Sequence, residues 1–265
     1  MKLDRRQRAM LQEMGVRVWQ PMPSEDASAG ASTKSQTAKK DVVAQPGPDV
    51  VPTERPMTTE LSGLGWEALR QTVAQCRACG LCQSRTQTVF GVGDTRSRWL
   101  VVGEAPGENE DLQGQPFVGQ AGLLLDNMLR ALGLSRQATD EQAVYIANVL
   151  KCRPPANRNP SPQEVTQCQP YLQRQVELLQ PKIILALGRF AAQSLLQASV
   201  PEVANMALGK LRGQVHRYLG IPVVVSYHPA YLLRTPQDKA KAWADLCLAR
   251  SLLLHELAAD GSRKP

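Results

Sequence analysis

Three cysteines in steps of three open the most distinctive stretch of the sequence, CRACGLCQSR at residues 76–85. Thiolates are good ligands for iron and for zinc, and closely spaced cysteines are typical of such sites. The chain has six cysteines, and the other three are Cys152, Cys168 and Cys247. The spacing alone leaves two interpretations open: Cys76, Cys79 and Cys82 as three ligands of an iron–sulfur cluster, or a zinc site made of four thiolates.

A second group of side chains suited to chemistry follows short apolar segments. Glu104 lies in GEAPGENED, Phe117 in LQGQPFVG, Asn148 just before KCRPPANRNP, and His228 in SYHPAYLLR. Each has an ordinary alternative, as a turn residue, a core aromatic, a loop cap or a buried histidine. The glycine-rich turn matches neither GxxxxGK[ST] nor GxGxxG, so neither of these two phosphate-binding motifs is present.

The elements that would position these residues alternate between strand and helix. Apolar strands are expected at 98–103, 143–150, 182–188 and 221–229, and helices at about 119–132, 162–179, 189–197 and 238–257. This alternation predicts an α/β domain with a parallel sheet covered on both faces. Ligands bind beyond the carboxyl ends of such strands, where Glu104, Asn148 and His228 fall.

The composition changes along the chain and predicts its domains. Residues 1–20 are expected to form a short amphipathic helix, and residues 21–60, rich in Pro, Ser, Ala, Thr, Lys and Gln, a disordered linker. The globular domain is placed at 61–258, followed by a C-terminal tail at 259–265.

The net charge and the apolar segments limit the expected environment and partners. The 265-residue chain carries 31 basic and 24 acidic residues, a net charge of +7, which fits a polyanionic partner and a soluble protein with basic tails equally well. The charged N-terminus lacks the apolar region of a secretory signal, and no apolar run is long enough to cross a bilayer. We therefore expect a cytoplasmic protein with reduced cysteines, which favours metal binding or catalysis over disulfides.

Four segments together resemble the iron–sulfur uracil-DNA glycosylases of family 4. They are CRAC with the later RTQTVFGVG, GEAPGENEDLQGQPFVGQAG, NVLKCRPPANRNP and HPAYLLR, and the resemblance runs from about residue 76 to 248. It implies a uracil-DNA glycosylase-like fold, a four-stranded parallel sheet sandwiched between helices. It also implies base excision repair by hydrolysis of the bond between uracil and deoxyribose, which leaves an abasic site.

The resemblance also implies roles for individual residues. The implied uracil-binding residues are Gly103, Glu104, Ala105, Phe117, Asn148 and His228. The implied catalytic residues are Glu104, His228, Asn157 and Glu110, with Glu104 ranked first among the groups that could orient water. A DNA-inserting loop is implied at Tyr231, Leu232, Leu233 and Arg234, where Leu232 or Leu233 would fill the space left by a flipped base.

By the same resemblance, a [4Fe–4S] cluster would be held by Cys76, Cys79, Cys152 and Cys168. Cys82 then lies outside the ligand set, and Cys247 is expected to be a buried apolar residue. Zinc ribbons usually pair CxxC with a second close pair, and the wide gap between Cys152 and Cys168 does not fit that habit. The cluster is expected to be structural, holding a loop beside the DNA.

Two functions remain open at the level of sequence. The first is a monofunctional glycosylase acting on single- or double-stranded uracil-containing DNA as a monomer. A related iron–sulfur group forms a covalent bond through a histidine in an added basic loop, but ANRNPSPQEV contains no histidine, so a hydrolytic enzyme that turns over is expected. The alternative is a catalytically silent iron–sulfur module that binds DNA or a polymerase. Residues 1–20 are either an idle tail or a helix with a protein partner.

Overall fold

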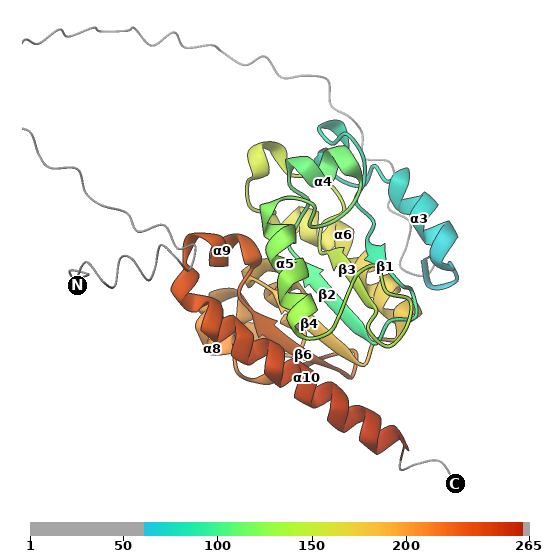
Figure 1. Cartoon of the computed structure of the whole chain (residues 1–265). Helices are drawn as coiled ribbons and strands as arrows, with labels where there is room; N and C mark the ends of the chain where they lie inside the picture. The colour runs from blue at the N-terminus through green and yellow to red at the C-terminus, as the bar shows by residue number, and fades with distance from the viewer. Residues whose placement is uncertain (1–60, 262–265) are drawn as a thin grey trace, which may run out of the picture. The chain divides into compact units, whose positions relative to one another are not determined.

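A six-stranded sheet forms the centre of the protein in a computed structural model that describes residues 61–261, with side chains through residue 258. The helix predicted at 1–20 and the linker predicted at 21–60 lie outside the described residues. The strands lie in the order β1-β3-β2-β4-β6-β5 (Figure 1). Their bounds are β1 Val92–Gly93, β2 Trp99–Gly103, β3 Val144–Asn148, β4 Ile183–Leu187, β5 Val215–Tyr218 and β6 Ile221–Ser226.

The four inner strands, β3, β2, β4 and β6, are parallel to one another, which confirms the predicted α/β class. Every residue of β2, β3 and β4 is buried, as expected for strands covered on both faces. The two outer strands were not predicted, and both run antiparallel to their neighbours. β1 has only two residues, and the side chains of β5 are exposed or half-buried, so neither produces an apolar run.

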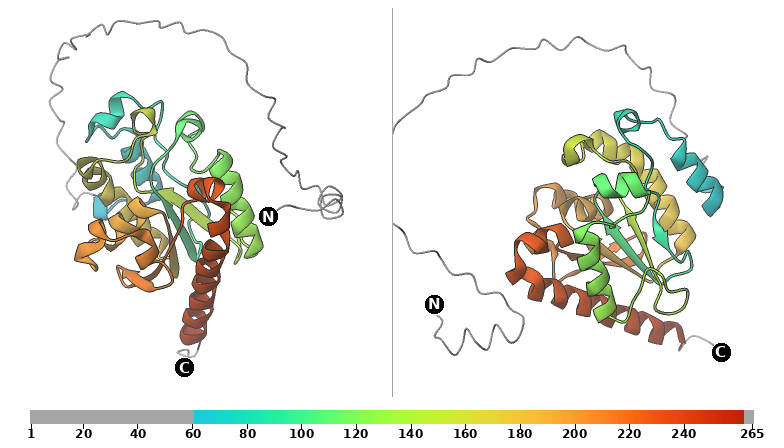
Figure 2. Two further views of the ribbon diagram at one scale, coloured as in Figure 1. Left: turned by 90° about the vertical axis from the view of Figure 1, so that its left-hand side faces the viewer. Right: turned by 45° about the horizontal axis from the view of Figure 1, so that its top comes forward.

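Two layers of helices cover the sheet, as Figure 2 shows. On one face, Val101 and Leu185 pack with α5 (Gln120–Ala131) and α10 (Lys239–Gly261). On the other face, Leu100 and Ile184 pack with α6 (Pro162–Leu179) and α7 (Arg189–Leu196). Successive strand residues therefore serve opposite halves of the core, because side chains alternate across a strand.

Shorter elements complete the described part of the chain. α3 (Trp66–Ala74) packs beside α6. The remaining α-helices are α4 (Glu108–Gln113), α8 (Leu208–Leu211) and α9 (Pro229–Arg234). The 3-10 turns are η1 (Gly80–Gln83), η2 (Pro155–Asn157), η3 (Pro201–Asn205) and η4 (Pro236–Asp238). Among the residues described, no helix is long and apolar enough to cross a membrane.

The sheet topology brings distant segments of the sequence to one edge. The loops that follow β2, β3 and β6 all leave from the carboxyl ends of parallel strands, which lie at the same edge of the sheet; β4 separates β6 from β2. The short helices α4, η2 and α9 lie in these loops. Side chains about 120 residues apart in the sequence can therefore meet at this edge.

Candidate active site and cysteine centre

A cavity of about 530 Å³ lies at this edge of the sheet, within the usual size range of small-molecule sites. Its lining residues are Glu104, Ala105, Pro106, Gly107, Glu110, Phe117, Ala121, Asn148, Pro154, Asn157, Arg158, His228, Ala230, Tyr231 and Arg234. The structure thus brings together nearly all of the predicted pocket and catalytic residues. Leu232 and Leu233 do not line the cavity, and Gly103 lies beneath it.

Gly103 makes room for two of the pocket side chains. A methyl group at this position would overlap Asn148 Oδ1 and would lie 2.6 Å from Phe117 Cζ. The amide and the ring therefore both pack directly against the glycine backbone. Gly103 also pairs with Asn148 in the ladder between β2 and β3, so the strand register fixes this contact.

The Asn148 amide is available to a ligand. Asn148 is only 2% exposed, and its Oδ1 atom is buried without a hydrogen-bond partner in the described part of the chain. A buried acceptor without a donor costs about 1–3 kcal/mol, so such atoms in native proteins usually have a functional explanation. Because this amide lines the cavity, a ligand N–H group is the donor that would satisfy it.

The Phe117 ring is held in place by a strained and anchored loop. Its φ of 56° lies in the left-handed region, which L residues with bulky side chains avoid. Arg136 Nη1 donates to the carbonyl oxygen of Pro116 at 2.8 Å, while Val118 N–H donates to Glu110 Oε1 at 2.9 Å. The backbone is thus fixed on both sides of Phe117.

The Glu110 carboxylate accepts hydrogen bonds from backbone N–H groups through both of its oxygens. Oε1 also accepts from Gly119 N–H at 3.2 Å, and Oε2 accepts from Gly107 N–H at 3.1 Å in the capping box of α4. With both oxygens engaged, Glu110 is better suited to shaping the loops around the cavity than to orienting a water molecule.

His228 lies beside Phe117, with ring centroids 5.4 Å apart and an interplanar angle of 27°. The backbone N–H of Ala230 donates to His228 Nδ1 at 3.2 Å, so the neutral imidazole carries its proton on Nε2. Burial, followed by the charge of Arg234, lowers the pKa of His228 to about 4. At neutral pH the ring is therefore a neutral Nε2–H donor in the wall of the cavity.

The other polar groups of the cavity differ in environment. Burial raises the pKa of the Glu104 carboxyl to about 7, so it gains and loses its proton near physiological pH. Asn157 is exposed, has a φ of 53°, and accepts a hydrogen bond from Arg153 Nε at 2.8 Å. Both side chains face the same cavity from neighbouring loops.

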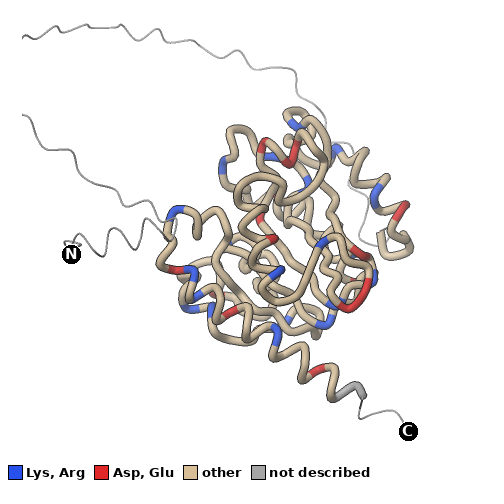
Figure 3. The backbone as a smooth tube through the Cα atoms, viewed as in Figure 1, with Lys and Arg blue, Asp and Glu red and all other residues tan. Residues whose placement is uncertain are grey.

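The loop predicted to insert into DNA folds as the short helix α9. Leu232 is 1% exposed and belongs to the core, whereas Leu233 is 43% exposed. The Tyr231 hydroxyl donates to Asp238 Oδ2 at 2.6 Å. Figure 3 shows basic positions around α9 and the start of α10. Arg234 lies in the last turn of α9, and Lys239 is the first residue of α10. Of the two leucines, only Leu233 is accessible for insertion.

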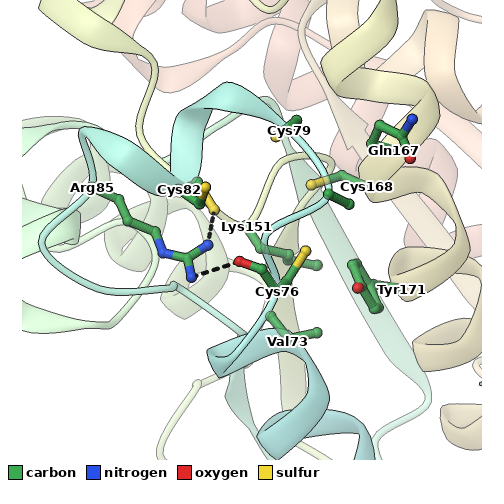
Figure 4. A pocket seen from close by; sticks show the side chains of 11 residues that line it. Val73, Cys76, Cys79, Cys82, Arg85, Lys151, Gln167, Cys168 and Tyr171 are labelled. Carbon is green, nitrogen blue, oxygen red and sulfur yellow. Dashed lines mark hydrogen bonds between the residues drawn. The ribbon is translucent and has the colours of Figure 1, made fainter. Parts of the chain in front are cut away.

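Five cysteines line a second, smaller cavity between η1, the loop after β3 and α6. They are Cys76, Cys79, Cys82, Cys152 and Cys168 (Figure 4). Arg85 lies beside them: Nη1 donates to Cys152 Sγ at 2.9 Å, and Nη2 donates to the carbonyl oxygen of Cys76 at 2.8 Å. Burial raises the pKa of Cys152 to about 11 and that of Cys168 to about 12.

The cysteine centre fits a metal cluster in its chemistry. Its ligating atoms are all thiols, which suit iron–sulfur clusters and zinc, and the set contains one cysteine more than the four required. Within residues 61–261, no group of three or more His, Cys, Asp or Glu side chains is arranged to hold a metal ion. The prediction that Cys247 is buried is wrong: it is exposed, because it lies on the outer side of α10.

Comparison with known proteins places the chain in a family. A family model described as "Uracil DNA glycosylase superfamily" matches residues 90–247. A type-4 uracil-DNA glycosylase of Archaeoglobus fulgidus is 44% identical over 177 residues, covering 65% of this chain and 85% of the relative. The type-4 enzyme of Sulfurisphaera tokodaii is 41% identical (64% and 76% covered), and that of Thermotoga maritima is 40% identical (66% and 86%). The chain belongs to the uracil DNA glycosylase superfamily.

Several residues of this superfamily member were not singled out from the sequence. Arg158 lines the cavity, and its guanidinium pairs with Glu164; the quoted ANRNP motif already contained it. Arg136 follows α5 and anchors the loop at Pro116, and no sequence pattern signals that contact. Lys151 is fully buried and lines the cysteine cavity. Its position directly after an apolar strand segment and directly before Cys152 could have indicated this burial.

Proposed function

We propose that this protein is a monofunctional uracil-DNA glycosylase that flips uracil out of DNA and hydrolyses its N-glycosidic bond. The abasic site that remains is the substrate of base excision repair. Membership of the superfamily and the type-4 relatives support this function. The observation that carries it is the buried Asn148 amide with an unsatisfied acceptor, in one cavity with an aromatic ring, a neutral histidine and a carboxyl group.

Asn148 and Phe117 account for base recognition. Asn148 Oδ1 accepts from uracil N3–H, and the amide nitrogen donates to uracil O4. Cytosine has an acceptor at N3 and a donor at N4, so it would face the amide with mismatched groups. Phe117 stacks on the base, which recovers about 1–3 kcal/mol of the cost of unstacking it from DNA. Gly103 and Ala105 line the pocket with backbone rather than bulky side chains.

His228 stabilises the departing base. Breaking the bond places negative charge on the uracil carbonyl oxygen, and Nε2–H of His228 donates to that oxygen. The hydrogen bond from Ala230 N–H fixes the tautomer in advance, so the donor does not have to reorganise during the reaction. A neutral imidazole is sufficient for this role, which agrees with its lowered pKa.

Glu104 and Asn157 orient the attacking water on the sugar side. The ionised Glu104 carboxylate also faces the positive charge that develops on the deoxyribose, as carboxylates do in glycoside hydrolysis. Glu110 contributes indirectly, by holding the loops that carry Gly107 and Val118. No histidine is present in 155–165, which supports hydrolysis and turnover without a covalent enzyme–DNA bond.

Cys76, Cys79, Cys152 and Cys168 would hold a [4Fe–4S] cluster, and Cys82, which lines the same cavity, is left out of the ligand set. Support comes from their placement around one cavity, although they come from three separate segments. When bound, the cluster would crosslink these segments and replace the protons of buried thiols. Pro154, Asn157 and Arg158, which follow Cys152, line the uracil cavity, so cysteines that hold a cluster would also fix one of its walls.

The remaining parts of the proposal concern DNA binding, the location of the enzyme in the cell and its partners. Leu233 fills the space left by the flipped base, and the basic side chains around α9 contact phosphates of single- or double-stranded DNA. We place the enzyme in the cytoplasm as a monomer, with residues 1–20 as the segment available to a protein partner. All of these assignments belong to the proposal.

The variant His228→Ala tests whether the protein is a glycosylase or a catalytically silent DNA-binding module. Loss of one preorganised donor should lower uracil excision by roughly 10²–10³-fold, with DNA affinity within about twofold of the wild type. The control is His255→Ala, because His255 is exposed on α10 and should affect neither. Equal loss of excision and DNA binding would assign His228 a structural role, and a wild-type protein that binds DNA without excision would favour the module.

A further inference from the structure

A buried lysine in the wall of the cysteine cavity donates a hydrogen bond to the backbone of a residue that lines the candidate active site. Lys151 lies three residues after Asn148 and immediately before Cys152, and it lines the cysteine cavity. It is 1% exposed and is one of the largest fully buried side chains in the described domain. Lysine is almost never fully buried unless it is paired, so its hydrogen-bond partners indicate why it is here.

The Lys151 side-chain nitrogen has two acceptors at short distances. Nζ donates to the backbone carbonyl oxygen of Asn148 at 2.7 Å and to Gln175 Oε1 at 2.6 Å. Gln175, on α6, is itself fully buried and donates through Nε2 to the carbonyl oxygen of Phe90 at 2.9 Å. The chain of hydrogen bonds therefore runs from Asn148 through Lys151 to α6, the helix that also carries Cys168.

The bond to Asn148 is made at the point where its strand ends. β3 ends at Asn148, and the next two backbone N–H groups, of Val149 and Leu150, donate to the carbonyl oxygens of Gly103 and Glu104. The carbonyl of Asn148 is held instead by the Lys151 side chain. Since the direction of the Asn148 side chain depends on this peptide plane, a shift of the carbonyl would turn the amide in the uracil pocket.

We infer that Lys151 is a positioning residue for Asn148, and that it links the uracil-reading amide to the cysteine centre. The inference rests on the proposed function of the pocket and adds a residue that does not touch the base. A 2.7 Å hydrogen bond from a fully buried side chain suits a contact that must fix the neighbouring amide to a fraction of an ångström.

The test is inhibition of uracil excision by free uracil, measured as an inhibition constant on the cluster-containing holoprotein. This constant reports base recognition and does not depend on what fraction of the sample is active. Lys151→Met removes the Nζ donor but keeps much of the side-chain volume. The double variant Lys151→Met with Gln175→Leu also removes the acceptor that would be left unpaired. Lys210→Met, at an exposed lysine on α8, is the matched control.

We expect both Lys151 variants to raise the inhibition constant for uracil by about tenfold, which corresponds to the loss of one hydrogen bond. Iron and sulfide content should stay near that of the wild type, and Lys210→Met should match the wild type throughout. An unchanged inhibition constant, or loss of the cluster from both variants, would overturn the inference and leave Lys151 a structural residue of the cysteine centre. A wild-type protein that does not excise uracil from DNA would overturn the proposed function as well.

Discussion

Gly103→Ala tests whether the uracil pocket is built on the backbone of one glycine. The added methyl group would overlap Asn148 Oδ1 and lie 2.6 Å from Phe117 Cζ, whereas ordinary van der Waals contact begins at 3.4 Å. The ring must therefore retreat by about 0.8 Å, and the amide by more. Misplacement of reacting groups by about 1 Å can cost 10²-fold in rate, so kcat/KM for uracil excision should fall by about 100-fold.

The assay is steady-state excision of uracil from an oligonucleotide, with thermal unfolding measured alongside it. Overpacking of this kind costs typically 1–3 kcal/mol, so the variant should remain folded but unfold at a lower temperature. Gly209→Ala is the control, because a methyl group there meets no atom within 4 Å. A folded Gly103→Ala protein with wild-type kcat/KM would refute the placement of Asn148 and Phe117 against this glycine.

Three further predictions address the carboxyl group, the cysteines and α9. Burial raises the pKa of Glu104 to about 7, so kcat/KM should fall as the pH drops below about 7, and a pH–rate profile of Glu104→Gln should lack this limb. The folded protein binds this proton more tightly than the unfolded chain, so the Glu104 contribution to stability should decline as the pH rises from 4.5 to about 7. Cys152→Ser should lose iron and solubility together, whereas Cys82→Ser should keep its iron. Iron analysis and visible absorption measure both; the reverse result would make Cys82 the ligand and Cys152 the cysteine outside the cluster. Leu233→Ala should reduce excision from duplex DNA more than from single strands at unchanged stability, whereas Leu232→Ala should lower the free energy of unfolding by about 2–5 kcal/mol, which denaturation with urea would measure.

The inner part of the sheet was predictable because buried parallel strands leave a clear signal. The segments WLVVG and IILAL are continuous apolar runs, and in the structure they are buried on both faces. Strand order was not predictable in the same way, since it depends on pairing between segments far apart in the sequence. The edge strands were missed because β1 is two residues long and β5 is half exposed.

The strand-end residues of the site followed from one rule, that parallel strands present their carboxyl ends together. This rule alone predicted the positions of Glu104 and Asn148, which line one cavity. The left-handed backbone of Phe117 and the engagement of both Glu110 oxygens could not be derived, because they depend on loop geometry rather than residue type. The burial of Lys151 depends likewise on α6 supplying Gln175.

The central claim is tested most directly with purified wild-type protein and an oligonucleotide that carries a single uracil. We expect alkali-labile breakage at the uracil position, free uracil as the released product, and no breakage of a matched strand with thymine at that position. An intact uracil strand, with the protein folded, its iron retained and DNA bound, would contradict the glycosylase assignment.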